Sequence, residues 1–111
     1  MVDKSFVPER GDIIWLNFNP QTGHEQRGRR PALVVSPAIY NEKTGLALVC
    51  PITSQKKGYP FEVPLGSSKV KGVVLADQIK SVDWQERRAK LVSRGNEVVF
   101  EKIRGLLREL I

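Results

Sequence analysis

Short apolar runs alternate with polar turns along the chain up to residue 93. Six of the runs are rich in β-branched or aromatic residues and are bounded by turn-forming residues, the pattern of short β-strands. The expected strands lie at residues 11–19, 30–37, 46–52, 60–65, 72–84 and 89–93. In the first run both alternating phases are apolar, which predicts a strand covered on both faces. The segment AIYNEKTG, residues 38–45, is expected to be a turn, so no helix is expected between the strands.

The pattern changes after residue 95, where apolar positions form one helical stripe. Asn96 is the expected N-cap. The stripe consists of Val99, Ile103, Leu106, Leu107 and Leu110. Gly105 inside this helix costs about 1 kcal/mol, which close packing of another segment would explain. The elements predict a single domain, residues 1–111, that is mainly β with a C-terminal helix: a small antiparallel barrel or sandwich.

Composition narrows the class of protein. The 111 residues carry a formal net charge of +6 and a pI near 9.8, which favours an anionic partner, although a solvated basic surface gives the same balance. No apolar run approaches the ~20 residues that span a bilayer, and the first residues lack the apolar segment of a signal peptide. We therefore expect a cytoplasmic protein with no membrane partner. Cys50 lies in an apolar run and is expected in the core, and one His with one Cys cannot supply the usual zinc ligands, so no metal or cofactor is expected.

The segment TGHEQRGRRP, residues 22–31, gathers several reactive groups in one polar loop. Gly23 and Gly28 have the spacing of a phosphate-binding loop, but arginines occupy its Lys and Ser/Thr positions, and a β-branched run follows instead of a helix. The arginines could hold phosphate through paired hydrogen bonds or could be solvated. His24 could carry a proton near neutral pH or be inert, and Glu25 could be a base or an ion-pair partner.

Two further polar clusters follow apolar runs. Residues 53–59 place hydroxyl, amide, ammonium and phenol groups in one loop, and these groups can bind phosphate and stack a base of single-stranded nucleic acid. Asp77 and Gln78 interrupt an apolar strand, where Asp77 could read a base, transfer a proton or only pair locally. Trp15 and Trp84 lie in apolar contexts and are expected in the core or at an interface.

Three segments in order resemble the MazF/PemK family of toxin endoribonucleases. The resemblance is carried by GDIIWLNFNPQTGHEQRGRRPALVVSP, YNEKTGLALVCPITSQKKGYPFEV and GVVLADQIKSVDW, within residues 10–84. It implies an SH3-like small β barrel with a C-terminal helix, a homodimer, and sequence-specific, metal-independent cleavage of single-stranded messenger RNA that inhibits translation. It also implies a MazE-like antitoxin whose acidic C-terminal segment covers the RNA groove.

The resemblance also implies roles for single residues. Arg30 matches an arginine that stabilises the transition state, Thr53 matches the hydroxyl residue beside it, and Glu25 matches a glutamate with a supporting role. The PemK branch has an arginine with an acid role where this chain has Leu75, although His24 matches that branch's loop histidine. The expected catalytic residues are Arg30, Thr53, Glu25 and His24. The residues expected to contact RNA are Gln26, Arg27, Arg29, Gln55, Lys56, Lys57, Tyr59, Asp77, Gln78 and Lys80.

Cleavage without metal uses the ribose 2′-OH as the nucleophile and leaves a 2′,3′-cyclic phosphate and a 5′-OH. It needs a base, an acid and stabilisation of charge on phosphorus. A guanidinium with a pKa above about 12 suits the charge but is a poor proton carrier at pH 7. The base is therefore expected to be Glu25, His24 or Asp77, and the sequence leaves these three open.

Two alternatives to RNA cleavage remain at this stage. The first is a non-enzymatic toxin of the same fold that poisons a protein target such as gyrase, as CcdB does. CcdB relies on a Trp-Gly-Ile C-terminus, and the ending Glu109, Leu110, Ile111 of this chain disfavours that alternative. The second is a nucleic-acid-binding β barrel without catalysis.

Overall fold

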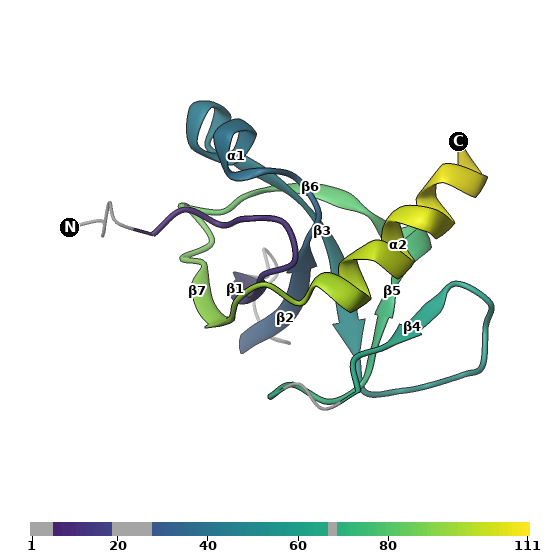
Figure 1. Ribbon diagram of the computed structural model, residues 1–111. Helices are drawn as coiled ribbons and strands as arrows, with labels where there is room; N and C mark the ends of the chain where they lie inside the picture. Colours follow the sequence, from purple (N-terminus) through teal and green to yellow (C-terminus); the bar gives the residue numbers. More distant parts are fainter. Residues whose placement is uncertain (1–5, 19–27, 67–68) are drawn as a thin grey trace.

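The computed structural model describes residues 6–18, 28–66 and 69–111. The elements are β1 (Ile13–Phe18), β2 (Gly28–Val34), α1 (Ala38–Thr44), β3 (Leu46–Thr53), β4 (Glu62–Pro64), β5 (Val73–Leu75), the 3₁₀ turn η1 (Ala76–Gln78), β6 (Lys80–Asp83), β7 (Lys90–Ser93) and α2 (Glu97–Leu110) (Figure 1). All pairings are antiparallel, in the order β4-β5-β3-β2-β1-β7, and β6 pairs with β3. The expected mainly β fold with a C-terminal helix is confirmed. Within the described residues the two edge strands β4 and β7 do not pair, so the sheet is bent but does not close into a barrel.

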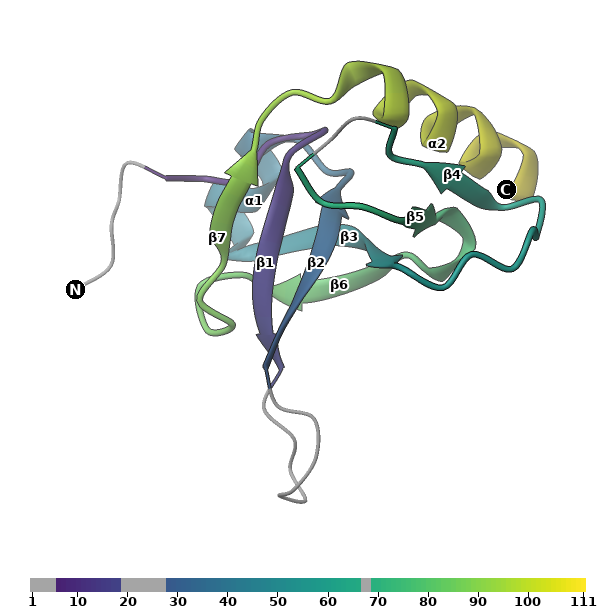
Figure 2. The same cartoon turned by 90° about the horizontal axis from the view of Figure 1, so that it is seen from below.

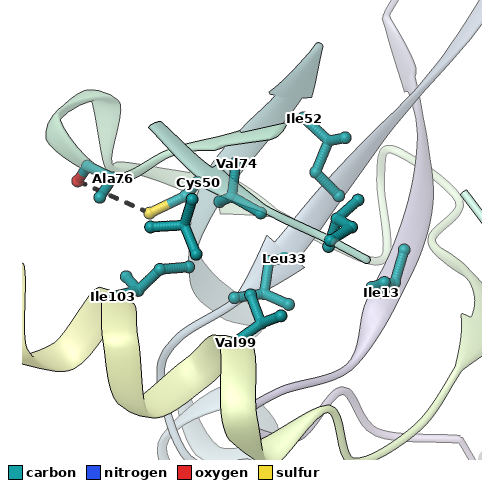
Figure 3. Close-up of a cluster of buried hydrophobic side chains, with 10 residues drawn as sticks. Ile13, Leu33, Cys50, Ile52, Val74, Ala76, Val99 and Ile103 are labelled. Carbon is teal, nitrogen blue, oxygen red and sulfur yellow. Dashed lines mark hydrogen bonds between the residues drawn. The ribbon is translucent and has the colours of Figure 1, made fainter. Parts of the chain in front are cut away.

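The sheet buries apolar side chains on both faces. Ile13 belongs to a cluster with Leu33 and Cys50, whereas its neighbour Ile14 belongs to a second cluster with Val34. Successive strand residues point to opposite faces, so one strand supplies both clusters. The prediction that the first strand is covered on both faces is confirmed. Figure 3 shows the first cluster, where Cys50 lies among aliphatic side chains as expected.

Helix α2 covers the first cluster. Val99 and Ile103 are buried against it, Leu106 and Leu107 pack at its margin, and Leu110 is 45% exposed at the helix end. The predicted N-cap is confirmed, because the Oδ1 of Asn96 accepts a hydrogen bond from the backbone N–H of Val99 at 3.3 Å. The close packing expected at Gly105 is wrong: a methyl group there would meet no atom within 4 Å. No helix in the described ranges is long and apolar enough to cross a membrane.

The segment expected to be a turn at residues 38–45 is instead the helix α1, which the buried side chain of Asn41 anchors. Its Nδ2 donates to the backbone oxygens of Pro8 at 2.7 Å and Ser36 at 3.1 Å. Gly45 ends the helix with a φ of +75°, and its N–H donates to the oxygen of Asn41 at 3.0 Å. These contacts stabilise a seven-residue helix whose own sequence reads as a turn.

The prediction of a single strand over residues 72–84 is also wrong. The segment is divided by η1 into the two strands β5 and β6. Both strands lie along the same edge of β3, β5 beside Ile52 and Thr53 and β6 beside residues 46–49. The backbone N–H and C=O of Leu48 both point toward β2. Backbone groups of successive strand residues point to alternate sides, so the nitrogen of Pro51, three residues later, points toward β5 and β6. Proline has no N–H to donate, and the ladder is interrupted there.

A buried carboxylate just before β1 contacts the segment before α2. Asp12 is 1% exposed and accepts the N–H of Glu9 at 2.9 Å. The Nη1 of Arg94 lies 3.3 Å from its Oδ2. Burial raises the pKa of Asp12 above its usual value, although Arg94 and the backbone N–H groups oppose this shift.

Candidate functional site

The pairing of β2 with β3 relates the two residues expected to act on the phosphate. The strands pair at Ala32–Pro51, Leu33–Cys50 and Val34–Val49. Arg30 lies two residues before Ala32 and Thr53 two residues after Pro51, so both stand just beyond the last of these pairs. Ala32 and Pro51 are directly opposite and so point to the same face, and residues two apart in a strand repeat that direction, so Arg30 and Thr53 project to this face as well. Arg30 is exposed, and Thr53 is half-buried.

The hydroxyl group of Thr53 accepts a local hydrogen bond. Its Oγ1 accepts the backbone N–H of Gln55 at 3.1 Å, a local turn that fixes the oxygen at the end of β3. A hydroxyl can accept such a bond and still donate its own O–H. Thr53 can therefore donate to an oxygen placed between itself and Arg30.

Gly72 lies directly against the backbone of Thr53. A Cβ at Gly72 would come within 2.3 Å of the carbonyl oxygen of Thr53, and the φ of Gly72 is +128°. Only glycine fits such a close approach with this backbone conformation. Gly72 thus helps to set the position of Thr53. In the sequence this role has no signal other than a glycine that precedes a β-branched run.

The loop after Thr53 is organised by Glu62, a residue absent from the sequence-based candidates. Its carboxylate accepts the backbone N–H of Lys57 at 2.9 Å and that of Gly58 at 2.9 Å. The expected RNA-contacting residues of this loop are all exposed: Gln55, Lys56, Lys57 and Tyr59. The Glu62 carboxylate fixes the backbone of the loop, while the ammonium groups and the phenol ring of the loop face solvent.

The third polar cluster lies beside the middle of β3. Asp77 and Gln78 are exposed in η1, not in a strand as expected, and Lys80 is exposed at the start of β6, opposite Val49. Burial, and secondarily the charge of Asp77, raises the pKa of the Cys50 thiol to about 12. Cys50 is therefore a neutral core residue and not a nucleophile at pH 7.

Arg29 and Arg30 lie on opposite faces of β2. Arg30 pairs with Leu16 of β1, and Arg29 pairs with Asn17 and places its guanidinium 5.8 Å from the ring centroid of Trp15. Trp84 is buried as expected, whereas Trp15 is only half-buried. The remaining predicted residues, His24, Glu25, Gln26 and Arg27, lie outside the described residues.

A shallow hollow of about 390 Å³ separates β4 from α2. Apolar groups of Val63, Pro64 and Leu106 line it together with charged side chains of both elements. None of the described residues that are predicted to act on RNA lines this hollow. The described candidates lie at the start of β2, the end of β3, the loop after β3, η1 and the start of β6.

Known proteins match both the sequence and the fold. The chain is 55% identical over 84 residues to the endoribonuclease toxin MazF of Escherichia coli strain K12, with 76% of each chain covered. It is 42% identical over 108 residues to the endoribonuclease toxin ChpB of the same strain, covering 92% of this chain and 91% of ChpB. A crystal structure of MazE-MazF from Deinococcus radiodurans superposes with a TM-score of 0.90 at 55% identity, covering 95% of this chain and 96% of that one. Residues 9–111 match the family described as PemK-like, MazF-like toxin of type II toxin-antitoxin system, and the chain belongs to this family.

Proposed function

We propose that this protein is the toxin of a toxin-antitoxin pair and an endoribonuclease that cleaves single-stranded messenger RNA at specific sequences, without metal, and so inhibits translation. The observation that supports the proposal is the pairing of β2 with β3, whose alternation directs Arg30 and Thr53 to one face of the sheet just beyond the last paired residues. The relatives named above as endoribonucleases support RNA cleavage over poisoning of a protein target such as gyrase.

In the proposed reaction the ribose 2′-oxygen attacks the adjacent phosphorus, and the bond from phosphorus to the 5′-oxygen breaks. The base takes the 2′-OH proton, an acid gives a proton to the leaving 5′-oxygen, and the products are a 2′,3′-cyclic phosphate and a 5′-OH. Negative charge gathers on the phosphoryl oxygens in the transition state, where the planar guanidinium of Arg30 and the O–H of Thr53 donate hydrogen bonds. Glu25, His24 and Asp77 remain the candidate bases, and Asp77 is exposed in η1.

The binding surface proposed for RNA combines the cations of the β1–β2 hairpin with the loop after β3. Arg29, Lys56, Lys57 and Lys80 are all exposed and suit a polyanion. Tyr59, 61% exposed, offers a ring on which a base can stack.

The proposed partners follow from the same surface and from the relatives. The Deinococcus radiodurans MazF neighbour was solved with MazE, and we infer a MazE-like antitoxin for this chain, whose acidic C-terminal segment would neutralise the same cations as RNA. A homodimer in the cytoplasm completes the proposal. An acidic antitoxin peptide should compete with RNA; binding of both at saturation would contradict a shared surface.

The proposed function is tested by Arg30→Ala and Arg30→Lys, measured for melting temperature, RNA affinity and single-turnover cleavage. If the guanidinium stabilises charge that appears in the transition state, Arg30→Ala lowers the cleavage rate by about 10²- to 10³-fold while affinity falls much less. Arg30→Lys stays well below wild type, because an ammonium cannot form the two-pronged contact. A folded Arg30→Ala protein that cleaves at nearly the wild-type rate would show that the assignment is wrong.

A further inference from the structure

Trp15 differs from the other tryptophan in its surroundings. Trp84 is 5% exposed, packs in the second core cluster and donates its indole N–H to the backbone oxygen of Asn41 at 2.9 Å. Trp15 is half-buried and belongs to neither core cluster of the described residues. A tryptophan that the core does not enclose keeps part of its ring available to a ligand.

Two cations flank this ring, one on each side of β1. Lys90 of β7 lies directly opposite Trp15, so both side chains point to the same face with Cβ atoms about 5 Å apart. On the β2 side the guanidinium carbon of Arg29 lies 5.8 Å from the ring centroid. Both cations are exposed, and within the described part of the chain neither forms an ion pair with a carboxylate.

The distance of Trp15, Arg29 and Lys90 from Arg30 indicates which nucleotide of a bound RNA could reach them. Arg29 and Arg30 are neighbours in β2, with Cα atoms about 3.8 Å apart, but successive strand residues point to opposite faces. Helix α2 lies toward the start of β1, while the hairpin end of β1 and β2 projects away from it (Figure 2). The Trp15 ring and its two cations therefore lie close to Arg30 along the hairpin, but on the opposite face of the sheet.

We propose that Trp15, Arg29 and Lys90 form a subsite for one nucleobase of single-stranded RNA, on a nucleotide that flanks the cut bond; this inference rests on the proposed function. An indole offers a flat surface on which any base can stack, and a guanidinium and an ammonium beside it neutralise the phosphates of that nucleotide. An acidic peptide would use the two cations but has no need of the ring. The combination of ring and cations favours a nucleic acid.

The two tryptophans allow a direct optical test with matched single-tryptophan proteins. Trp84→Phe keeps only Trp15, and Trp15→Phe keeps only Trp84. The probe is a short single-stranded RNA made uncleavable by 2′-O-methyl groups, which block the proposed nucleophile. We expect this RNA to quench the fluorescence of the Trp84→Phe protein and to leave that of the Trp15→Phe protein unchanged.

Affinity gives the second measurement. Trp15→Ala should weaken binding of the same RNA by about 5- to 150-fold, the equivalent of one lost stacked base. Trp15→Phe should lose less, because a phenyl ring still stacks. Lys90→Ala should reduce the salt dependence of binding by about 0.7 in the slope of log K against log salt.

Four outcomes would overturn the subsite. Equal quenching by polyphosphate, which has charge but no bases, would leave an anion site without base stacking. Failure of acrylamide to quench the Trp84→Phe protein would mean that another surface, such as a second copy of the chain, covers Trp15. Cleavage of unmodified RNA by wild-type protein, together with no RNA quenching of Trp15, would refute the subsite and leave the proposed function standing; absence of both cleavage and binding would refute the proposed function as well.

Discussion

Replacing Gly72 by alanine should impair cleavage without any change to a side chain that contacts RNA. The added Cβ would lie 2.3 Å from the carbonyl oxygen of Thr53 and 2.9 Å from its carbonyl carbon. Ordinary van der Waals contact begins at 3.4 Å, so the two backbones must separate by about 1.1 Å. Because β5 and β2 lie on opposite sides of β3, this separation would change the spacing between the Thr53 hydroxyl and Arg30 by up to a comparable distance.

A misplacement of about 1 Å at a reacting centre can cost about 10²-fold in rate, or about 2.7 kcal/mol in the barrier. We therefore expect Gly72→Ala to lower the single-turnover cleavage rate by about 10²-fold. RNA affinity should fall much less, because the exposed cations of the loop and the hairpin are retained. The assay is single-turnover cleavage at saturating protein, with affinity measured on an uncleavable RNA.

The control for backbone strain is Gly45→Ala. Gly45 also has a positive φ, +75°, but a methyl group there meets no atom within 4 Å, and the residue lies at the opposite end of β3 from Thr53. Both variants should lose about 1–3 kcal/mol of stability to strain, seen as a lower melting temperature. Only Gly72→Ala should lose cleavage rate. A folded Gly72→Ala protein that cleaves within about 3-fold of wild type would refute the role of this contact in positioning Thr53.

Two further predictions concern carboxylates. Glu62→Gln should weaken RNA binding several-fold, because the loop loses the charged acceptor of the Lys57 and Gly58 N–H groups, and should leave the cleavage rate at saturating RNA unchanged. The control is Glu42→Gln, which removes an exposed carboxylate on α1. Equal RNA affinities of the two variants in a binding titration would contradict the prediction. Asp12 has a raised pKa, so the folded state keeps its proton to higher pH than the unfolded state, and stability falls as pH rises from below 3.8 through the raised value. Urea unfolding of wild type and Asp12→Asn between pH 3 and 7 should show the variant gaining relative stability with pH; a constant difference would contradict the burial argument.

The strands could be predicted from sequence because the alternation that defines them is local. Both phases of β1 are apolar, and the structure buries Ile13 on one face and Ile14 on the other. The two errors in the assignment of helices and strands had non-local causes. Helix α1 depends on bonds from Asn41 to residues outside the helix, and the break at η1 coincides with a proline in a neighbouring strand, Pro51.

The candidate site was only partly predictable. Arg30 and Thr53 were expected from the resemblance. That both project to one face of the sheet depends on the register between β2 and β3, which no local pattern encodes. Glu62 and Gly72 act through the backbone of other residues, so their side-chain chemistry gave no signal. Trp15 was expected in the core or at an interface because its sequence neighbours are apolar; its half-buried position excludes full enclosure in the core of the chain and leaves the interface untested.

The most direct test of the proposed reaction is cleavage of an RNA in which one ribose, at a mapped cut site, is replaced by 2′-deoxyribose. If the 2′-oxygen is the nucleophile, cutting stops at that bond and continues at unmodified sites of the same molecule, in the presence of EDTA. The fragments from those sites should end in a 2′,3′-cyclic phosphate and begin with a 5′-OH. Continued cutting at the 2′-deoxy position would contradict the mechanism assigned to the Arg30–Thr53 site.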